Sequence, residues 1–173
     1  MNMIVDTVIE DDRWDAFGLD AVAQSAVEAT LQALGHPAFG LSLCLMGCDD
    51  TRIAVLNADF RGKPQPTNVL SWPSEDRAAE KPGLDPDPPQ MGDEDEPEEL
   101  GDIAIAFDTC EREAAEQGKT MQDHVTHLIV HGLLHLLGYD HINDEDAELM
   151  EAHEVAILAT LGIPDPYSQV GPA

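Results

Sequence analysis

One eleven-residue segment limits the local structure of this chain more than any other: His131-Gly-Leu-Leu-His135-Leu-Leu-Gly138-Tyr-Asp-His141. His131 and His135 are four residues apart, which places them one turn apart on the same face of an α-helix. Glycines that follow helices often adopt the left-handed conformation, so Gly138 is expected to turn the chain and bring His141 in from the side. Neutral imidazole is the commonest metal ligand. The segment therefore predicts a helix, a turn and one metal ion bound by His131, His135 and His141.

Three protein ligands that leave a fourth position free are typical of a catalytic zinc site rather than a structural one. The same His-x3-His-x2-Gly-x2-His spacing occurs in the metzincin proteases, where a Glu directly after the first His is the general base. Gly132 occupies that position here. The segment therefore predicts a zinc site without the local peptidase base. A zinc peptidase stays an alternative only if a distant Glu supplies that base.

His127 is the one competitor for a place among the ligands. It lies one turn before His131 and forms a second i, i+4 pair with it. The set named above is preferred because only that set uses the glycine turn. For His124 and His127 we expect packing or a hydrogen bond to a metal ligand. His36 and His153 are expected at the surface.

The length of 173 residues suits one domain with a full hydrophobic core. No apolar run approaches 18 residues, so no membrane span is expected. The first residues lack the basic start and apolar stretch of a signal peptide. Three cysteines, Cys44, Cys48 and Cys110, form no paired framework, which favours a reducing compartment. We therefore expect a cytoplasmic protein in which residues 1–173 form a single domain.

Strand-like and helix-like segments alternate along the chain, which favours the α/β (or α+β) class with one mixed sheet. Thr120-x-x-Asp123 resembles a capping box that would begin the helix with the histidine pair. The expected strands are Met3–Ile9, Phe39–Met46, Asn68–Trp72 and Asp102–Phe107, and the expected helices are Leu19–Leu34, Asp49–Phe60, Thr109–Gln117, Met121–Leu137 and 143–161.

Ser74–Leu100 differs in kind from the rest of the chain. It contains five prolines, 11 acidic and 2 basic residues, and almost nothing to bury. Such a segment cannot offset the entropy lost on ordering. We expect residues 74–100 to be a mobile acidic insert within the single domain.

The charge of the chain argues against a general binder of phosphate backbones. With 8 basic and 35 acidic residues the net charge is −27, whereas affinity for nucleic acids depends on Lys and Arg. Any affinity for RNA would have to come from a local patch or from partner proteins.

The run from Leu56 to Ser71 is the second unusual segment, and it holds Arg61, Lys63 and Asn68. The planar fork of an arginine suits the oxygens of phosphate or carboxylate groups. Taken alone, the run fits equally well a surface turn whose Arg61 pairs with one of the many acids.

Together, the two segments resemble the YbeY family of bacterial metal-dependent endoribonucleases and rRNA maturation factors. The resemblance rests on Leu-Asn-x-x-Phe-Arg-Gly-x-x-x-Pro-Thr-Asn-Val-Leu-Ser, Leu100-Gly-Asp-Ile and His-Gly-x-Leu-His-Leu-x-Gly-Tyr-Asp-His. Order and spacing agree from about Val5 to Asp165-Pro-Tyr167. The departure is Ser74–Leu100, longer and more acidic than the short connection of the family, which puts RNA contacts from this loop in doubt.

The resemblance implies a compact zincin-like domain with a small, mostly parallel sheet and one antiparallel edge. It implies single-stranded RNA as substrate, including precursor rRNA at the 3′ end of the small-subunit rRNA. The implied partner is the small subunit of the ribosome, with a role in its quality control; no DNA or membrane partner is expected. The implied site residues are His131, His135 and His141 for one zinc ion, Arg61 and His131 for catalysis, and Arg61, Lys63 and Asn68 for the substrate.

A mechanism follows from these residues. Zinc can lower the pKa of bound water to about 7 and polarise a phosphoryl oxygen. Arg61 would stabilise the charge of the transition state by about 3–4 kcal/mol. An alkoxide leaving group needs a general acid less than an amine does, so Gly132 favours phosphodiester over peptide cleavage. Whether water or the RNA 2′-hydroxyl attacks stays open, as does a non-catalytic ribosome-assembly role in which Cys110 closes the zinc site.

Overall fold

The computed structural model describes residues 4–36, 40–93 and 95–167. These residues form a four-stranded sheet with helices on both faces. The strands are β1 (Ile4–Ile9), β2 (Leu41–Cys48), β3 (Val69–Pro73) and β4 (Glu98–Ala106). The helices are α1 (Arg13–Phe17), α2 (Leu19–Leu34), α3 (Asp50–Arg61), α4 (Phe107–Glu116), α5 (Met121–Leu136) and α6 (Asp144–Thr160). The chain thus has the expected α/β class.

The sheet has the strand order β1-β2-β4-β3. β2 pairs in parallel with β1 and with β4, whereas β3 pairs antiparallel with β4. The expected mostly parallel sheet with one antiparallel edge is confirmed. β3 is an edge strand, because β4 is its one partner in this sheet order.

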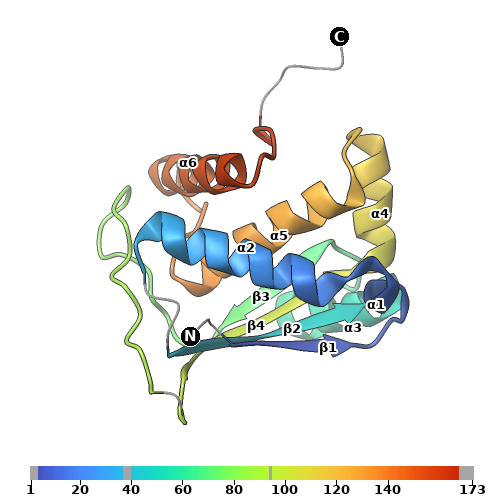
Figure 1. Ribbon diagram of the computed structural model, residues 1–173, viewed down its shortest axis with the longest axis horizontal. Helices are drawn as coiled ribbons and strands as arrows, with labels where there is room; N and C mark the ends of the chain where they lie inside the picture. The colour runs from blue at the N-terminus through green and yellow to red at the C-terminus, as the bar shows by residue number, and fades with distance from the viewer. Residues whose placement is uncertain (1–3, 37–39, 94, 168–173) are drawn as a thin grey trace.

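Both faces of the sheet are covered. α2 and α5 lie on one face with α6 above them (Figure 1). α3 packs on the other face. The larger core, which includes Leu45, Ile105 and Ile129, fills the space under α2 and α5. A smaller cluster around Ile53 and Leu70 fills the face toward α3. Burial on both faces explains why β2 and the last four residues of β4, 103–106, are nearly continuous apolar runs.

The metal-site helix, α5, lies close against β4. A Cβ at Gly132 would be 3.2 Å from Cδ1 of Ile103, and a Cβ at Gly101 would be 3.0 Å from Cδ2 of Leu136. Residue numbers rise along α5 as they fall along β4, so the helix runs antiparallel to this strand. The missing side chain at Gly132 lets the helix approach the sheet.

Local caps fix most element ends near their expected positions. Asp49, Thr120 and Asn143 each accept a hydrogen bond from the backbone N–H three residues later, at the starts of α3, α5 and α6. α1 was not expected, because five residues are too short to show a helical period. No helix in the described part of the chain has the length and hydropathy that a bilayer crossing requires.

β4 differs most from expectation at its start. β4 begins at Glu98 rather than Asp102, because the backbone there already pairs with β2 despite its acidic side chains. The expected first residues of two other strands, Met3 and Phe39, lie outside the described residues.

Residues 74–97 form no helix or strand where the structure describes them. The expectation that this segment has almost nothing to bury was wrong for Arg77, whose side chain is 6% exposed. Its guanidinium donates to the carbonyl oxygens of Leu100 and Leu136 at 3.2 and 3.1 Å. Farther along, Asp85 accepts a hydrogen bond from the hydroxyl of Tyr139 at 2.7 Å. These contacts fasten the segment to β4 and to the end of α5, while its mobility stays a prediction.

Candidate metal centre

The turn after α5 has the geometry that the sequence predicted. Gly138 has a φ of 108°, in the region that favours glycine. The N–H groups of Gly138 and Tyr139 donate to the carbonyl oxygens of His135 and Leu134, which is the pattern of a Schellman motif. A Cβ at Gly138 would also overlap the backbone of Arg77. Two separate reasons, the backbone conformation and the lack of space for a Cβ, therefore require glycine at this position. The third histidine follows three residues later.

His131, His135 and His141 come together as predicted. One ligand atom from each lies within 4.8 Å of the others, and the Nε2 atoms of His131 and His135 are 3.1 Å apart. Tetrahedral coordination with bonds of 2.0–2.1 Å would require nitrogens about 3.3 Å apart. The three rings therefore fit a zinc-sized ion after small adjustments. His141 is exposed, so the site lies at the surface.

The ring of His135 is oriented and neutral. Its Nδ1 lies 3.0 Å from the carbonyl oxygen of Tyr139, so the ring donates from Nδ1 and leaves Nε2 free for a metal. Burial and the nearby His131 lower the pKa of His135 to about 4. Metals bind neutral imidazole, which is the form of His135 that this pKa gives near pH 7.

Glu154 orients the other helical ligand. This residue of α6 is 0% exposed, and its Oε1 lies 2.8 Å from Nδ1 of His131. His127 Nε2 lies 3.1 Å from the same oxygen, and the hydroxyl of Tyr167 donates to Oε2 at 2.7 Å. Burial alone would raise the pKa of Glu154, but these hydrogen bonds outweigh it and lower that pKa to about 2. The ionised carboxylate accepts from all three groups.

Sequence reasoning missed Glu154 and Tyr167. The position of Glu154 in the sequence could have indicated its role, because it lies on the buried side of α6 with Met150, Ile157 and Leu158. A carboxylate at a core position of a helix is rarely buried unless it is paired. Tyr167 had no local signal, since it reaches Glu154 from the segment beyond α6.

His127 lies outside the ligand group. Its Nε2 faces Glu154, and its Nδ1 is buried without a hydrogen-bond partner in the described structure. The expected hydrogen bond is thus present, but its partner is Glu154, which contacts His131, rather than one of the three proposed ligands. The surface expectation for His153 was only partly right, because its ring is half-buried and its Nε2 lies 2.7 Å from Asp85.

The described residues offer no fourth histidine, cysteine or carboxylate to the group. Cys110 on α4 is buried, and its thiol faces the backbone oxygen of Asn68 at 3.8 Å. Oδ1 of Asp140 accepts the N–H of His141 at 2.8 Å and lies 4.0 Å from Nδ1 of His135. Cys110 therefore does not close the site, and Asp140 stabilises the turn.

Among the residues that the structure describes, no carboxylate joins the histidine group in place of the missing peptidase base. Gly132 faces Ile103 of the sheet. Glu154, the buried carboxylate beside the ligands, contacts Nδ1 of His131, on the side of the ring away from the metal-facing Nε2. Its two oxygens are already occupied by three donors.

Asn68 connects the second sequence segment to α5. Its side-chain amide donates to Glu113 of α4 at 2.9 Å, and its Oδ1 accepts the N–H of Val69 at 2.7 Å. The same Glu113 oxygen lies 2.9 Å from Nε2 of His124. Both ends of the Asn68 amide are thus held within the protein.

Arg61 and Lys63 lie at the end of α3 and in the turn after it, and both side chains are exposed. Neither forms an ion pair with any residue that the structure describes. The structure therefore does not support the alternative in which Arg61 pairs with one of the described acidic residues.

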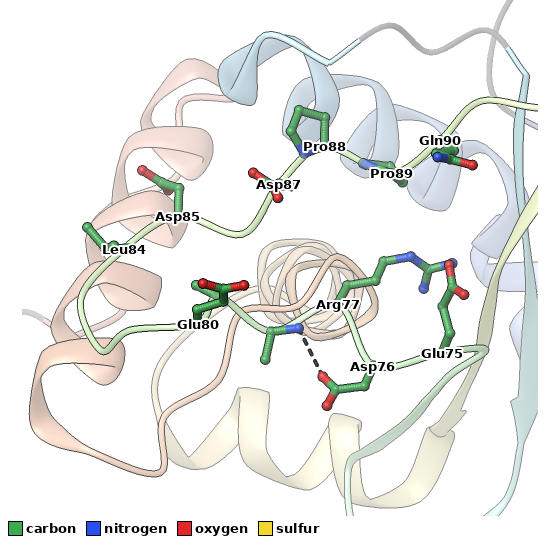
Figure 2. A pocket seen from close by; sticks show the side chains of 12 residues that line it. Glu75, Asp76, Arg77, Glu80, Leu84, Asp85, Asp87, Pro88, Pro89 and Gln90 are labelled. Atoms are coloured by element: carbon green, nitrogen blue, oxygen red, sulfur yellow. Dashed lines mark hydrogen bonds and ion pairs between the residues drawn. The ribbon is translucent and has the colours of Figure 1, made fainter.

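A separate hollow of about 630 Å³ lies within the acidic segment, between residues 75 and 90. Figure 2 shows Arg77 beside Glu75, with Glu80, Asp85 and Asp87 around the opening. None of the three histidines lines this hollow.

The fold and the site define an α/β protein in which three histidines, from a helix and the turn that follows it, form a group that could hold one metal ion. The comparisons with known proteins then identify the family. The model of the family described as Endoribonuclease YbeY matches residues 6–162, and this protein belongs to that family.

Several relatives carry the same description. The chain is 64% identical over 167 residues to Endoribonuclease YbeY of Cereibacter sphaeroides, covering 96% of this chain and 100% of the relative. It is 59% identical to that of Paracoccus denitrificans over 94% of this chain and 89% of the relative. The solution structure of TM1509 from Thermotoga maritima has the same fold, with a TM-score of 0.54, 19% identity, and coverage of 98% and 100%.

Proposed function

We propose that this endoribonuclease depends on zinc, cleaves single-stranded RNA and matures the 3′ end of small-subunit rRNA. It would act in the cytoplasm, bind the small ribosomal subunit and take part in ribosome quality control. Its family membership makes it a nuclease that acts on RNA in rRNA processing. The observation that carries this proposal is the convergence of His131, His135 and His141, the last of which is exposed to solvent. Residues 74–100 are proposed as an insert within one domain.

The donor set supports zinc as the ion. Three imidazoles without carboxylate ligands suit zinc better than magnesium or calcium, which prefer oxygen. When bound, zinc supplies a Lewis acid that polarises a phosphoryl oxygen and makes water a stronger acid. Glu154 and the carbonyl of Tyr139 hold the two helical imidazoles in the tautomer that directs Nε2 to the ion.

Arg61 and Lys63 are proposed to contact the RNA. Each presents an exposed cation with no ion pair among the described residues. The Arg61 fork would bind non-bridging phosphate oxygens, where negative charge increases in the transition state. For Asn68 the hydrogen bonds to Glu113 and Val69 favour a role in holding the loop rather than in direct contact with RNA.

One experiment tests the proposal. Elemental analysis of the purified protein is combined with cleavage of a single-stranded RNA before chelation, after chelation and after zinc is added back. We expect one zinc per chain, no cleavage after chelation and full recovery with zinc. A duplex RNA and a peptide serve as control substrates and should stay intact. Cleavage that persists in the metal-free protein would contradict the zinc requirement.

A further inference from the structure

Two aromatic side chains beside Arg61 have no place in the metal centre. Phe60, next to the end of α3, is 61% exposed. Its ring contacts that of Trp72 on β3 edge to face, with ring centroids 5.1 Å apart and planes at 84°. Trp72 is half-buried against the small core on the α3 face of the sheet. The pair is therefore an aromatic surface in contact with solvent.

The stretch of chain that holds this pair carries a net positive charge, which is unusual in so acidic a protein. Residues 60–74 contain Arg61 and Lys63 and no acidic residue, although the chain has 35 acids. The other four arginines, Arg13, Arg52, Arg77 and Arg112, all form ion pairs. Among the described residues Arg61 is the one arginine that forms none. Its charge is thus available to a partner outside the chain.

The register of the sheet places the aromatic pair level with the metal-site helix. Trp72 pairs with Asp102, which lies between Gly101, facing Leu136 of α5, and Ile103, facing Gly132 of α5. α3 and α5 pack against opposite faces of the sheet, because Ile53 of α3 belongs to the small core and Ile129 of α5 to the large one, and β3 is an edge strand of this sheet. A strand of RNA lying across this edge would contact both faces.

We propose that Phe60 and Trp72 form a base-stacking platform for the single-stranded RNA substrate, with Arg61 and Lys63 on the adjoining phosphates. Proteins that bind single strands combine aromatic side chains, which stack on bases, with cations that follow the backbone. Only unpaired bases expose the faces that such a surface needs, so the platform also selects single strands over duplexes. This inference rests on the proposed function, because it assigns a substrate contact to that activity.

Trp72 reports directly on binding. The other tryptophan, Trp14, is 0% exposed and its indole N–H donates to the carbonyl of Cys48, so bound RNA should not affect it. Titration of the metal-free protein with a short oligouridylate should quench the fluorescence of Trp72. The same titration with an oligomer of abasic sugar phosphates should leave it unquenched. Equal responses to both oligomers would overturn the stacking proposal.

Variants of Phe60 separate stacking from packing. In Phe60→Ala and in Phe60→Leu we expect KM for single-stranded RNA to rise about ten-fold, because the leucine keeps apolar bulk but lacks an aromatic face. Phe60→Tyr should restore the wild-type KM. Val55→Ala is the matched control, since Val55 is also apolar, 48% exposed and on α3. A Phe60→Leu variant with unchanged KM would overturn the proposal and leave the patch as a protein contact.

The outcomes separate this inference from the proposed function. If the wild-type, zinc-loaded protein cleaves single-stranded RNA while Phe60→Ala has an unchanged KM, only the platform fails. If the wild-type protein cleaves no RNA, the proposed function fails, and the fluorescence titration still decides whether the platform binds single strands.

Discussion

Glu154 on α6 and His131 on α5 share a hydrogen bond of 2.8 Å between Oε1 and Nδ1, across the packing of two helices. The bond fixes the tautomer of His131 and turns its Nε2 toward His135. A carboxylate in this position also makes the imidazole a stronger ligand. The metal centre is therefore assembled by the contact of α5 with α6 and not by α5 alone.

Glu154→Gln should weaken zinc binding about 10- to 100-fold. The amide oxygen can still accept from His127 and His131, but it lacks the negative charge that strengthens His131 as a ligand. The amide NH2 group would also replace the oxygen that accepts from the hydroxyl of Tyr167. Competition with a chromophoric chelator gives the affinity, and the thermal melt of the metal-free protein reports any loss of fold. Glu151→Gln, at an exposed position of the same helix, is the control. An unchanged competition curve in Glu154→Gln would remove its assigned role.

His135→Ala should lose the metal, whereas His127→Ala should keep one zinc per chain. The reason is that the His135 Nε2 lies in the ligand group, while the His127 Nε2 faces Glu154. Elemental analysis after dialysis decides between them. Zinc retained by His135→Ala and lost by His127→Ala would reverse the assignment.

Arg61→Ala should keep zinc and lose RNA cleavage by ten-fold or more, in line with loss of one contact to developing negative charge. Arg52→Ala is the matched control, because Arg52 lies on the same helix but pairs with Glu10 at 3.2 Å. Initial rates on single-stranded RNA are measured at equal zinc content. Full activity of Arg61→Ala would disprove its catalytic role.

Gly138→Ala should abolish zinc binding and lower the free energy of unfolding by more than about 2 kcal/mol. A φ of 108° strains any residue with a Cβ, and the added carbon would overlap the backbone of Arg77. Gly118→Ala is the control, since its φ is 66° and nothing lies within 4 Å; about 1 kcal/mol is expected there. Urea unfolding measures the free energy of unfolding of both variants. An equal decrease in the two would contradict the prediction, because the overlap with Arg77 would then add no destabilisation.

Asp108→Asn should lower stability at neutral pH by about 1 kcal/mol or less, and this loss should shrink below pH 4. Asp108 pairs with Arg13 at 2.7 Å and accepts the N–H of Asp50 at 3.2 Å. The hydrogen bond from Arg13 holds the pKa of Asp108 below its usual 3.8. A depressed pKa in the folded state stabilises above the unfolded pKa, and this stabilisation is lost as pH falls through the folded value.

Urea unfolding of the metal-free wild-type and Asp108→Asn proteins at pH 7 and pH 3 measures this difference. Metal-free protein is used so that the histidine ligands contribute equally to both chains. A difference in the free energy of unfolding that is the same at both pH values would contradict the prediction.

Local sequence determined much of the fold. The helix with the histidine pair, its start at Thr120 and its end at Gly138 follow from capping, 3.6-residue periodicity and glycine conformation, all of which act within a few residues. The early start of β4 at Glu98 could not be predicted, because strand pairing depends on β2, far away in the chain. The burial of Arg77 likewise depends on carbonyls of β4 and α5.

The same division holds in the metal centre. The sequence by itself determined the grouping of the three proposed ligands, because the spacing of His131, His135 and His141 on a helix and its turn leaves little freedom. Only the tertiary structure decided what orients them and what adjoins them. Glu154 reaches His131 from 23 residues away, and Phe60 meets Trp72 from a different element. Such contacts arise from the packing of helices against one another and against the sheet, which no local pattern encodes.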